Sequence, residues 1–311
     1  MELISQLTDR LLFAIPKKGR LHEHCISLLK GADINFNRRN RLDIALVHNL
    51  PVAIIFLPAA DIAKFVGEGN VDLGITGQDM VAESLMSEKV EEIIELGFGK
   101  CKLQVQAPVR NQIKDVKELV GKRMVTSFEN LTAKYFEELD NQYLSKEERT
   151  AGKKTKIEYI SGSVEASCAL GLADAIGIMK LKLIWLVKTG NTMKAAGLEP
   201  ISTILASQAI LIKNKHPKNQ SLINLITSRI KGVIAAKKYV LVNYNIERIN
   251  LKQAAIITPG RQAPTVSPLE DGNWIQVQSM VCREEIAHVM DKLEKIGATD
   301  ILVLNFDNCR V

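Results

Sequence analysis

Apolar runs alternate with helical patterns along the first hundred residues of the chain. Such alternation is typical of an α/β unit, with a parallel sheet covered on both faces. The expected strands, each bounded by Pro or Gly, are 11–15, 53–57 and 73–75, and the expected helices that follow them are 21–29, 59–66 and 78–85.

A second series of the same kind follows. The pattern predicts strands at 102–109, 123–127 and 157–161, with helices near 116–120 and at 130–139. The segment 142–156 is rich in Lys, Glu, Arg, Thr and Gly, which predicts a solvated loop, with a short charged helix as the alternative. These residues therefore form a second series of the α/β pattern.

The pattern changes after residue 213. A long amphipathic helix is predicted at 222–239. From residue 252 onward the pattern predicts a strand, a Pro/Gly-rich loop at 258–272, a strand at 274–281, a helix at 283–296 and a strand at 301–306. A small β-rich unit with helices on one face is the natural interpretation.

Composition places the chain among ordinary enzymes. With 311 residues and 46% hydrophobic content, it is long enough for two or three domains with real cores. The net charge of +6, from 41 basic and 35 acidic residues, suits anionic small molecules. The basic residues do not form the clustered stripe of a nucleic-acid binder, so we expect no nucleic-acid partner.

The cysteines and histidines carry no metal or disulfide pattern. The five cysteines lack C-x-x-C spacing and the five histidines form no H-x-x-x-H pair, so a reducing cytosol fits best and a cytoplasmic location is expected. Charged residues precede the first apolar run, which argues against a secretory signal. No stretch reaches the ~18 apolar residues of a membrane span.

A cationic turn follows the first predicted strand. Lys17, Lys18 and Arg20 place three positive charges within four residues, in a loop where α/β sheets hold ligands. Such a turn would suit a polyphosphate, and a solvated basic turn is the alternative.

A second candidate loop contains Thr76, Gly77 and Asp79. Glycines stand on both sides of the short strand at 73–75, and a helix opens at Thr76-Gly77. Exposed backbone N–H groups at such a start can hold an anion, and a tight turn that needs Gly is the alternative.

Two further loops follow predicted strands. Glu165, after Ser161-Gly162-Ser163, could bind a sugar hydroxyl or could only favour the start of a helix through the macrodipole. Thr189, Gly190, Asn191 and Thr192 precede a short helix and could cradle a phosphate, with a Thr N-cap that holds no ligand as the alternative. Four anion-suited loops at strand ends together indicate a site for phosphorylated substrates.

The chain resembles a known family, the long, feedback-regulated form of ATP phosphoribosyltransferase, and most closely its fungal members. The resemblance covers nearly the whole chain and keeps the motifs in order. The motifs are LLFAIPKKGRL, LPAADI, FVGEGNVDLGITGQD, CKLQVQAPV, VTSFENLTAKYF, SGSVEASCALGLADAI, TGNTMKAAGL, TPGRQAPTVSPLEDGNWIQV and GATDILVLNFDNCRV.

The resemblance implies a fold with three parts. Two α/β lobes like a type II periplasmic binding protein would form the catalytic core, and a C-terminal ferredoxin-like α+β domain would be regulatory. By position, lobe I would comprise 1–103 and 199–225, lobe II 104–198 with the phosphoribosyl pyrophosphate (PRPP) loop, and the histidine-binding domain 226–311.

The resemblance also implies the reaction. A glycosyltransferase of this family transfers the phosphoribosyl group of PRPP to N1 of ATP, with Mg²⁺, and releases pyrophosphate as the first step of histidine biosynthesis. Its transition state should resemble an oxocarbenium ion, so the protein must align two polyanions and neutralise the leaving group. The Mg²⁺ ligands are not assigned, since the substrate's pyrophosphate is expected to hold the metal.

Each candidate loop then acquires a role by resemblance. Thr189, Gly190, Asn191 and Thr192 would take the 5′-phosphate of PRPP, and Glu165 would lie beside the ribose. The cationic turn and the turn at Thr76, Gly77 and Asp79 would face the phosphates and the nucleotide, with Arg20 and Glu165 acting in catalysis. Histidine and AMP would inhibit the enzyme, and dimers would assemble into hexamers.

The chain departs from the family pattern at one point. The family follows ADAI after one residue with an Asp, then Leu-Val and the phosphate loop, whereas nine residues separate Ile176 from Leu186 here. The excess of seven residues, 177–183, puts Trp185 where the ribose-binding acid is expected. Loss of that carboxylate would weaken PRPP binding by about 3 kcal/mol.

Three accounts of this departure stay open. The extra segment could bulge outward while Asp174 or Glu165 replaces the acid, or it could leave a nearly inactive protein, or it could be an artefact of how the coding sequence was assembled. The alternative to an active transferase is thus an impaired homologue or a regulatory subunit that binds nucleotide and histidine.

Overall fold

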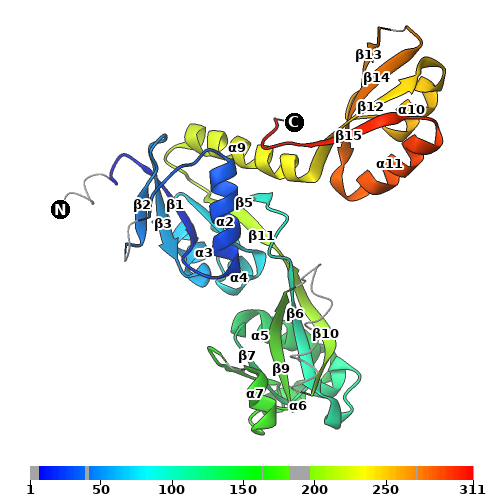
Figure 1. Ribbon diagram of the computed structural model, residues 1–311. Coiled ribbons are helices and arrows are strands. Elements are labelled where there is room, and N and C mark those ends of the chain that lie inside the picture. Colours follow the sequence, from blue (N-terminus) through cyan, green and yellow to red (C-terminus); the bar gives the residue numbers. More distant parts are fainter. Residues whose placement is uncertain (1–6, 39–41, 163, 182–196, 271, 311) are drawn as a thin grey trace. The chain divides into compact units, whose positions relative to one another are not determined.

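The architecture is seen in a computed structural model, which describes residues 7–38, 42–162, 164–181, 197–270 and 272–310 (Figure 1). The chain divides into two compact units, residues 1–25 with 36–220 and residues 26–35 with 221–311. Each unit is described by itself. The expected loop at Thr189–Thr192 and the expected position of Trp185 lie outside the described residues.

The first unit contains a six-stranded sheet with the order β2-β3-β1-β4-β11-β5. Its strands are β1 (Leu11–Pro16), β2 (Ile44–Leu46), β3 (Val52–Leu57), β4 (Leu73–Gly77), β5 (Val90–Glu95) and β11 (Ala209–Asn214). Three helices accompany it, namely α2 (Arg20–Gly31), α3 (Ala59–Gly67) and α4 (Gln78–Glu83).

Helix α3 packs closely on this sheet. A Cβ atom at Gly74 would lie 2.6 Å from Ile62 Cγ2 and 2.9 Å from Val66 Cγ2. Both contacts are shorter than real Cβ contacts, so only glycine allows the helix to approach β4 this far.

The sheet is only partly parallel. Strand β1 pairs in parallel with β3 and β4, as the alternation of strands and helices predicts. The parallel arrangement expected for these three strands is confirmed, whereas two strands that were not predicted run the other way: β2 is antiparallel to β3, and β11 is antiparallel to β4 and β5. The short turn from β2 to β3 and the direct return from β10 into β11 leave no room for crossover helices.

The same unit contains a five-stranded sheet with the order β10-β6-β9-β7-β8. Its strands are β6 (Cys101–Pro108), β7 (Arg123–Thr126), β8 (Lys156–Tyr159), β9 (Ala175–Leu181) and β10 (Leu198–Ser207). The helices are α5 (Glu129–Tyr143), α6 (Lys146–Thr150) and α7 (Val164–Ala169), with 3₁₀ turns at Val109–Asn111 and Val116–Leu119.

Strand β9 includes the first part of the seven-residue excess. It pairs antiparallel with β6 from Gln106 opposite Ile176 to Cys101 opposite Leu181. It also pairs in parallel with β7, where Thr126 lies opposite Gly177. The excess therefore begins as a regular strand and not as a bulge, as far as residue 181.

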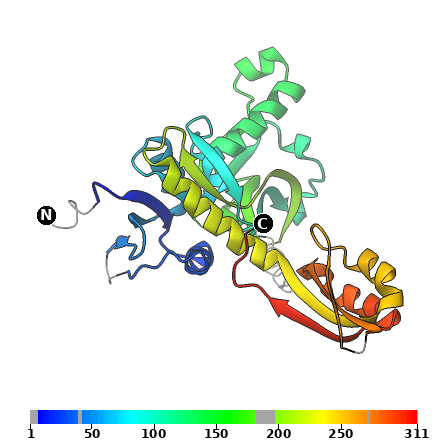
Figure 2. The same ribbon diagram turned by 90° about the horizontal axis from the view of Figure 1, so that it is seen from above.

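The second unit joins a long helix, α9 (Gln220–Lys238), to a four-stranded antiparallel sheet with the order β13-β14-β12-β15. The C-terminal segment runs back to the side of α9 in both views (Figure 1 and Figure 2). The remaining elements are β12 (Tyr239–Glu247), the 3₁₀ turn Arg248–Asn250, α10 (Leu251–Ile257), β13 (Thr265–Pro268), β14 (Trp274–Cys282), the 3₁₀ turn Arg283–Glu285, α11 (Ile286–Lys295) and β15 (Thr299–Asn305).

This order, β-α-β-β-α-β, is that of a ferredoxin-like domain. Tyr244 on β12 is fully buried, and its hydroxyl lies 2.7 Å from Thr258 Oγ1. Leu293 on α11 and Val277 on β14 belong to the same core. The expected architecture, two α/β lobes followed by a ferredoxin-like domain, is confirmed.

Two elements of the second unit correct the sequence interpretation. The strand expected from residue 252 is the helix α10, in which Ala254 is buried between the partly buried Leu251 and Ile257 while Ile256 is 81% exposed. That three-residue spacing is helical. Strand β12 was not predicted, although its buried and half-buried residues alternate with period two.

The other predicted elements are confirmed with small shifts in their ends. The helix expected near 116–120 is a 3₁₀ turn, Val116–Leu119, and the charged segment 142–156 contains the short helix α6. Ser145 opens α6 with a capping box, in which its Oγ accepts from Glu148 N at 3.2 Å. Among the described residues, no helix is both long and apolar enough to cross a membrane.

Candidate functional site

The cationic turn begins where β1 ends at Pro16. Lys17 N donates to Leu57 O at 2.7 Å, which ties the turn to the end of β3. Gly19 has a φ of +86°, a left-handed conformation that favours glycine, and its carbonyl accepts from His22 N at 3.0 Å in the first turn of α2. Lys17, Lys18 and Arg20 are consequently presented to solvent at the carboxyl end of β1.

The positive charge of Lys17 is paired with a carboxylate. Its Nζ donates to Asp43 Oδ2 at 2.7 Å, and Arg38 Nη2 donates to the other oxygen at 3.1 Å. The Lys17 hydrogen bond is the main cause that lowers the pKa of Asp43, and the charges of Lys17 and Arg38 add to it. Arg38 also stacks its guanidinium 4.0 Å above the Phe56 ring.

Lys18 and Arg20 differ from Lys17. Both side chains are exposed, and within the described part of the chain neither makes a hydrogen bond or an ion pair. Their charges are not offset by a neighbouring carboxylate. They are therefore the cations of the turn that can meet an incoming anion.

Thr76 and Gly77 are fixed by packing. Thr76 is fully buried in β4, and its hydroxyl donates to Ala59 O at 2.8 Å. A Cβ atom at Gly77 would overlap the Asp79 carboxylate, so this turn requires glycine. Thr76 as a whole is 0% exposed, so neither its side chain nor its backbone is open to a ligand in this structure.

Asp79 is buried and fixed by hydrogen bonds. It is 7% exposed, its Oδ1 accepts from Ser207 Oγ at 2.6 Å, and its backbone N donates to the same Oγ at 3.0 Å. Gln78 N donates to Gln208 O at 3.1 Å and Gln208 N donates to Gln78 Oε1 at 3.3 Å. The turn after β4 is thus fastened to the junction of β10 and β11.

A cavity of about 240 Å³ lies at this junction. Lys100 and Lys102 contribute positive charge to its wall, next to Cys101 and Ser207. Burial, assisted by the negative charge of Asp79, raises the pKa of Cys101 to about 11. This thiol stays protonated at neutral pH and is not a nucleophile.

Glu165 is placed at the start of α7, one residue after Val164. Its side chain is exposed in the second lobe, where the helix macrodipole favours a negative charge. Ile178 on β9 packs against the cluster that contains Val164 and Cys168 of the same helix. Ile178, the second residue after Ile176, is therefore a partly buried apolar side chain of this strand.

The described residues bring together only part of the predicted site. The ends of β1, β3 and β4 meet at one edge of the six-stranded sheet, and this edge carries Lys17, Lys18, Arg20 and Asp79. Ser163 and Thr189–Thr192 lie outside the described residues, and no contact joins Glu165 to the edge within the described part. Among the described residues, no group of three His, Cys, Asp or Glu side chains could hold a metal ion.

Four residues of the edge were missed by sequence reasoning. Arg38 and Asp43 stand before β2, Ser207 is the last residue of β10, and Gln208 stands between β10 and β11. The basic run that begins at Arg38 was a usable signal, because it resembles the cationic turn in composition. The sequence around Ser207 contains no signal for its role, because that role depends on a contact with a residue 128 positions away.

Comparisons with known proteins identify the family. Residues 58–232 match the family described as ATP phosphoribosyltransferase, and residues 236–308 match the one described as HisG, C-terminal domain. The chain is 51% identical over 316 residues to the ATP phosphoribosyltransferase of Schizosaccharomyces pombe and 54% identical over 311 residues to that of Yarrowia lipolytica, with 100% of each chain covered.

A solved structure has a similar fold. It is the ATP phosphoribosyl transferase (HisG:HisZ) complex from Thermotoga maritima, with a TM-score of 0.56 and 22% sequence identity. The match covers 71% of this chain and 96% of that chain.

Proposed function

The chain belongs to the ATP phosphoribosyltransferase family, the glycosyltransferases of the first step of histidine biosynthesis, and we propose which of its residues meet the two substrates. The reaction joins C1 of the PRPP ribose to N1 of ATP, giving 1-(5-phosphoribosyl)-ATP and pyrophosphate. Both substrates are polyanions, so the site must offer positive charge and fixed hydrogen-bond partners.

The observation that carries the proposal is the edge formed by the ends of β1, β3 and β4. It combines Lys18 and Arg20, two cations that make no ion pair within the described residues, with the buried Asp79–Ser207 pair. Ligands of α/β sheets bind at the carboxyl ends of the strands. Lys18 and Arg20 neutralise phosphate charge, and Lys17 with Asp43 and Arg38 holds the turn in shape.

Glu165 and the phosphate loop complete the site from the second lobe. Glu165 accepts hydrogen bonds from the ribose hydroxyls, and Thr189, Gly190, Asn191 and Thr192 bind the 5′-phosphate. Arg20 stabilises the charge that develops on the leaving pyrophosphate, since a guanidinium pairs well with phosphate oxygens. Thr76, Gly77 and Asp79 shape the wall that faces the nucleotide.

Mg²⁺ is proposed to enter bound to the substrate phosphates. The carboxylates at the sheet edge are already engaged, Asp43 with two cations and Asp79 with Ser207, so they offer no open cage for a divalent ion. This donor set fits a metal carried mainly by pyrophosphate oxygens and water. When bound, the ion neutralises the negative charge of the leaving group.

The ferredoxin-like domain is proposed to be regulatory. We assign residues 226–311 to it, 1–103 with 199–225 to lobe I, and 104–198 to lobe II. The domain binds histidine as feedback inhibitor, AMP also inhibits, and copies of the chain assemble from dimers into hexamers in the cytoplasm. A βαββαβ fold with a core of its own suits a separate regulatory task.

The direct test of the function is pyrophosphate release from ATP and PRPP in the presence of Mg²⁺. The purified chain should release pyrophosphate only when both substrates are present, and histidine should lower the rate. A chain that binds ATP and histidine in calorimetry but releases no pyrophosphate would fit a regulatory subunit instead.

An impaired homologue is the second candidate, and one observation favours it. Counted forward from Ile176, the ribose-binding Asp of the family pattern falls on Ile178, which is packed against α7. Apolar contact cannot replace two hydroxyl hydrogen bonds. A chain that lacks residues 177–183 and carries Trp185→Asp should then turn over faster than the natural one, and equal rates would remove this second candidate.

A further inference from the structure

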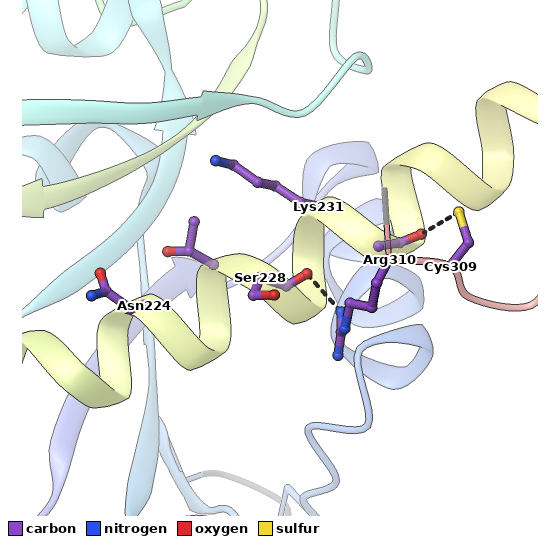
Figure 3. Close-up of a pocket in the computed structure, with 7 residues that line it drawn as sticks. Asn224, Ser228, Lys231, Cys309 and Arg310 are labelled. Carbon is purple, nitrogen blue, oxygen red and sulfur yellow. Dashed lines mark hydrogen bonds between the residues drawn. The ribbon is translucent and has the colours of Figure 1, made fainter. Parts of the chain in front are cut away.

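A second cavity lies on α9, in the unit that contains the ferredoxin-like domain, and its volume is about 350 Å³ (Figure 3). Five of its lining residues come from the helix, namely Asn224, Thr227, Ser228, Lys231 and Gly232. Their spacing of three and four places them on one helix face. The other wall is the C-terminal segment with Cys309 and Arg310.

The C-terminal segment is held firmly against α9. Arg310 Nη1 donates to Ser228 O at 2.6 Å, and Cys309 N donates to Gly232 O at 3.3 Å. Asn308 Nδ2 donates to Gly31 O at 3.1 Å. A Cβ atom at Gly232 would lie 2.6 Å from Cys309 O, so the absence of a side chain at Gly232 lets the segment close the cavity.

The charged side chains that line the cavity, Lys231 and Arg310, are both basic. Helix α9 carries four basic residues and no Asp or Glu from residue 220 to 238. Arg229 is paired with Asp33 at 3.5 Å, whereas Lys231 makes no ion pair within the described residues. Arg310 uses one nitrogen on Ser228 O and keeps other N–H groups for a ligand.

A buried hydroxyl also lacks a partner. Thr227 is 8% exposed, and among the described atoms its Oγ1 has no hydrogen-bond partner. An unsatisfied buried hydroxyl is costly. A rotation about χ1, between the two rotamers that threonine uses in helices, exchanges its methyl and its hydroxyl, so that it can donate to a ligand in the cavity.

We propose that this cavity binds a small tetrahedral oxyanion, either inorganic phosphate or a small phosphomonoester, through Lys231, Arg310 and the Thr227 hydroxyl. No carboxylate faces the cavity in the described part of the chain, so an anion meets no like charge there. None of its lining residues belongs to the sheet edge that is proposed to bind ATP and PRPP. A bound anion would link the C-terminal segment to α9, because it would contact Arg310 on the segment and Lys231 and Thr227 on the helix.

Equilibrium dialysis with radiolabelled inorganic phosphate tests the site in the full chain. Lys231→Gln should weaken one class of phosphate site at least about tenfold, the usual worth of a charge-assisted hydrogen bond. Lys237→Gln is the matched control, because it removes the same charge from an exposed position of the same helix outside the cavity. Sites at the catalytic edge contribute equally to all variants.

Thr227→Val separates ligand binding from a structural role. Valine keeps the volume and removes the unpartnered hydroxyl, so the phosphate-free protein should melt at the same or a higher temperature while phosphate affinity falls. Competition with ribose 5-phosphate tells the two ligand sources apart. Identical phosphate isotherms for wild type, Lys231→Gln and Lys237→Gln would overturn the proposal, as would a lower melting temperature of Thr227→Val with unchanged phosphate binding.

Discussion

Asp79 and Ser207 form a buried pair in which the serine hydroxyl donates to the carboxylate at 2.6 Å and accepts from the Asp79 backbone N at 3.0 Å. The two residues are 128 positions apart and are 7% and 6% exposed. One hydroxyl thus satisfies both a buried charge and a buried N–H group. The pair fixes the turn after β4 against the end of β10, which is the geometry that the proposed site requires.

Ser207→Ala should destabilise the protein. The substitution leaves the Asp79 carboxylate and its N–H group without their partner in a buried position, which should cost about 1–3 kcal/mol. Urea denaturation followed by circular dichroism measures the change. Ser221→Ala, at an exposed position of α9, is the control and should lie within about 0.5 kcal/mol of wild type. Equal midpoints for the two variants would show that the pair contributes nothing.

Asp43 should make stability depend on pH. The hydrogen bond from Lys17, with the charges of Lys17 and Arg38, lowers the pKa of this carboxyl in the folded state below its unfolded value of 3.8. Its stabilising contribution is therefore complete above that value and is lost as the pH falls through the folded pKa. Both groups are exposed, so the effect is small and decreases with salt.

The pH effect can be isolated with Asp43→Asn. Its melting temperature should lie slightly below that of wild type at pH 7, and the difference should shrink as the pH falls below 3.8. Glu158→Gln removes a negative charge from an exposed position of β8 and serves as control. A difference that stays constant from pH 7 to pH 3 would refute a role for the Lys17–Asp43 ion pair.

Gly74→Ala should disturb the packing of α3 on β4. The added methyl group would meet Ile62 Cγ2 at 2.6 Å and Val66 Cγ2 at 2.9 Å, and overpacking of this kind costs about 1–3 kcal/mol. Gly162→Ala adds the same group where no atom lies within 4 Å, so its stability should change little. Thermal unfolding of the two variants compares them, and equal melting temperatures would contradict the packing argument.

Most of the fold could be predicted from local pattern. Strand β1 and helix α2 follow from an apolar run, a basic turn and a 3.6-residue period, all of which are visible within 20 residues. Helix α10 could not be distinguished from a strand in the sequence, because its apolar run is short. Its helical spacing becomes visible only when the structure shows which of its residues are buried. The antiparallel pairing of β11 with β4 joins segments that are far apart in the sequence, so no local pattern predicts it.

The candidate site was predictable only where charge is clustered in sequence. The cationic turn was found because three basic residues stand within four positions. The ion pair between Lys17 and Asp43 could not be predicted from the sequence, because Asp43 is 26 residues away and its position depends on the pairing of β2 with β3. The same limit explains why Ser207 was missed.

Replacement of Arg20 is the most direct test of whether its guanidinium binds the substrate phosphates. Pyrophosphate release should be measured for wild type, Arg20→Gln and Lys30→Gln with Mg²⁺ and varied PRPP and ATP, because Lys30 is an exposed cation in the last turn of the same helix. Loss of a charge-assisted contact predicts that Arg20→Gln lowers kcat/KM at least about tenfold while Lys30→Gln matches wild type. Equal kcat/KM values for all three proteins would contradict the account.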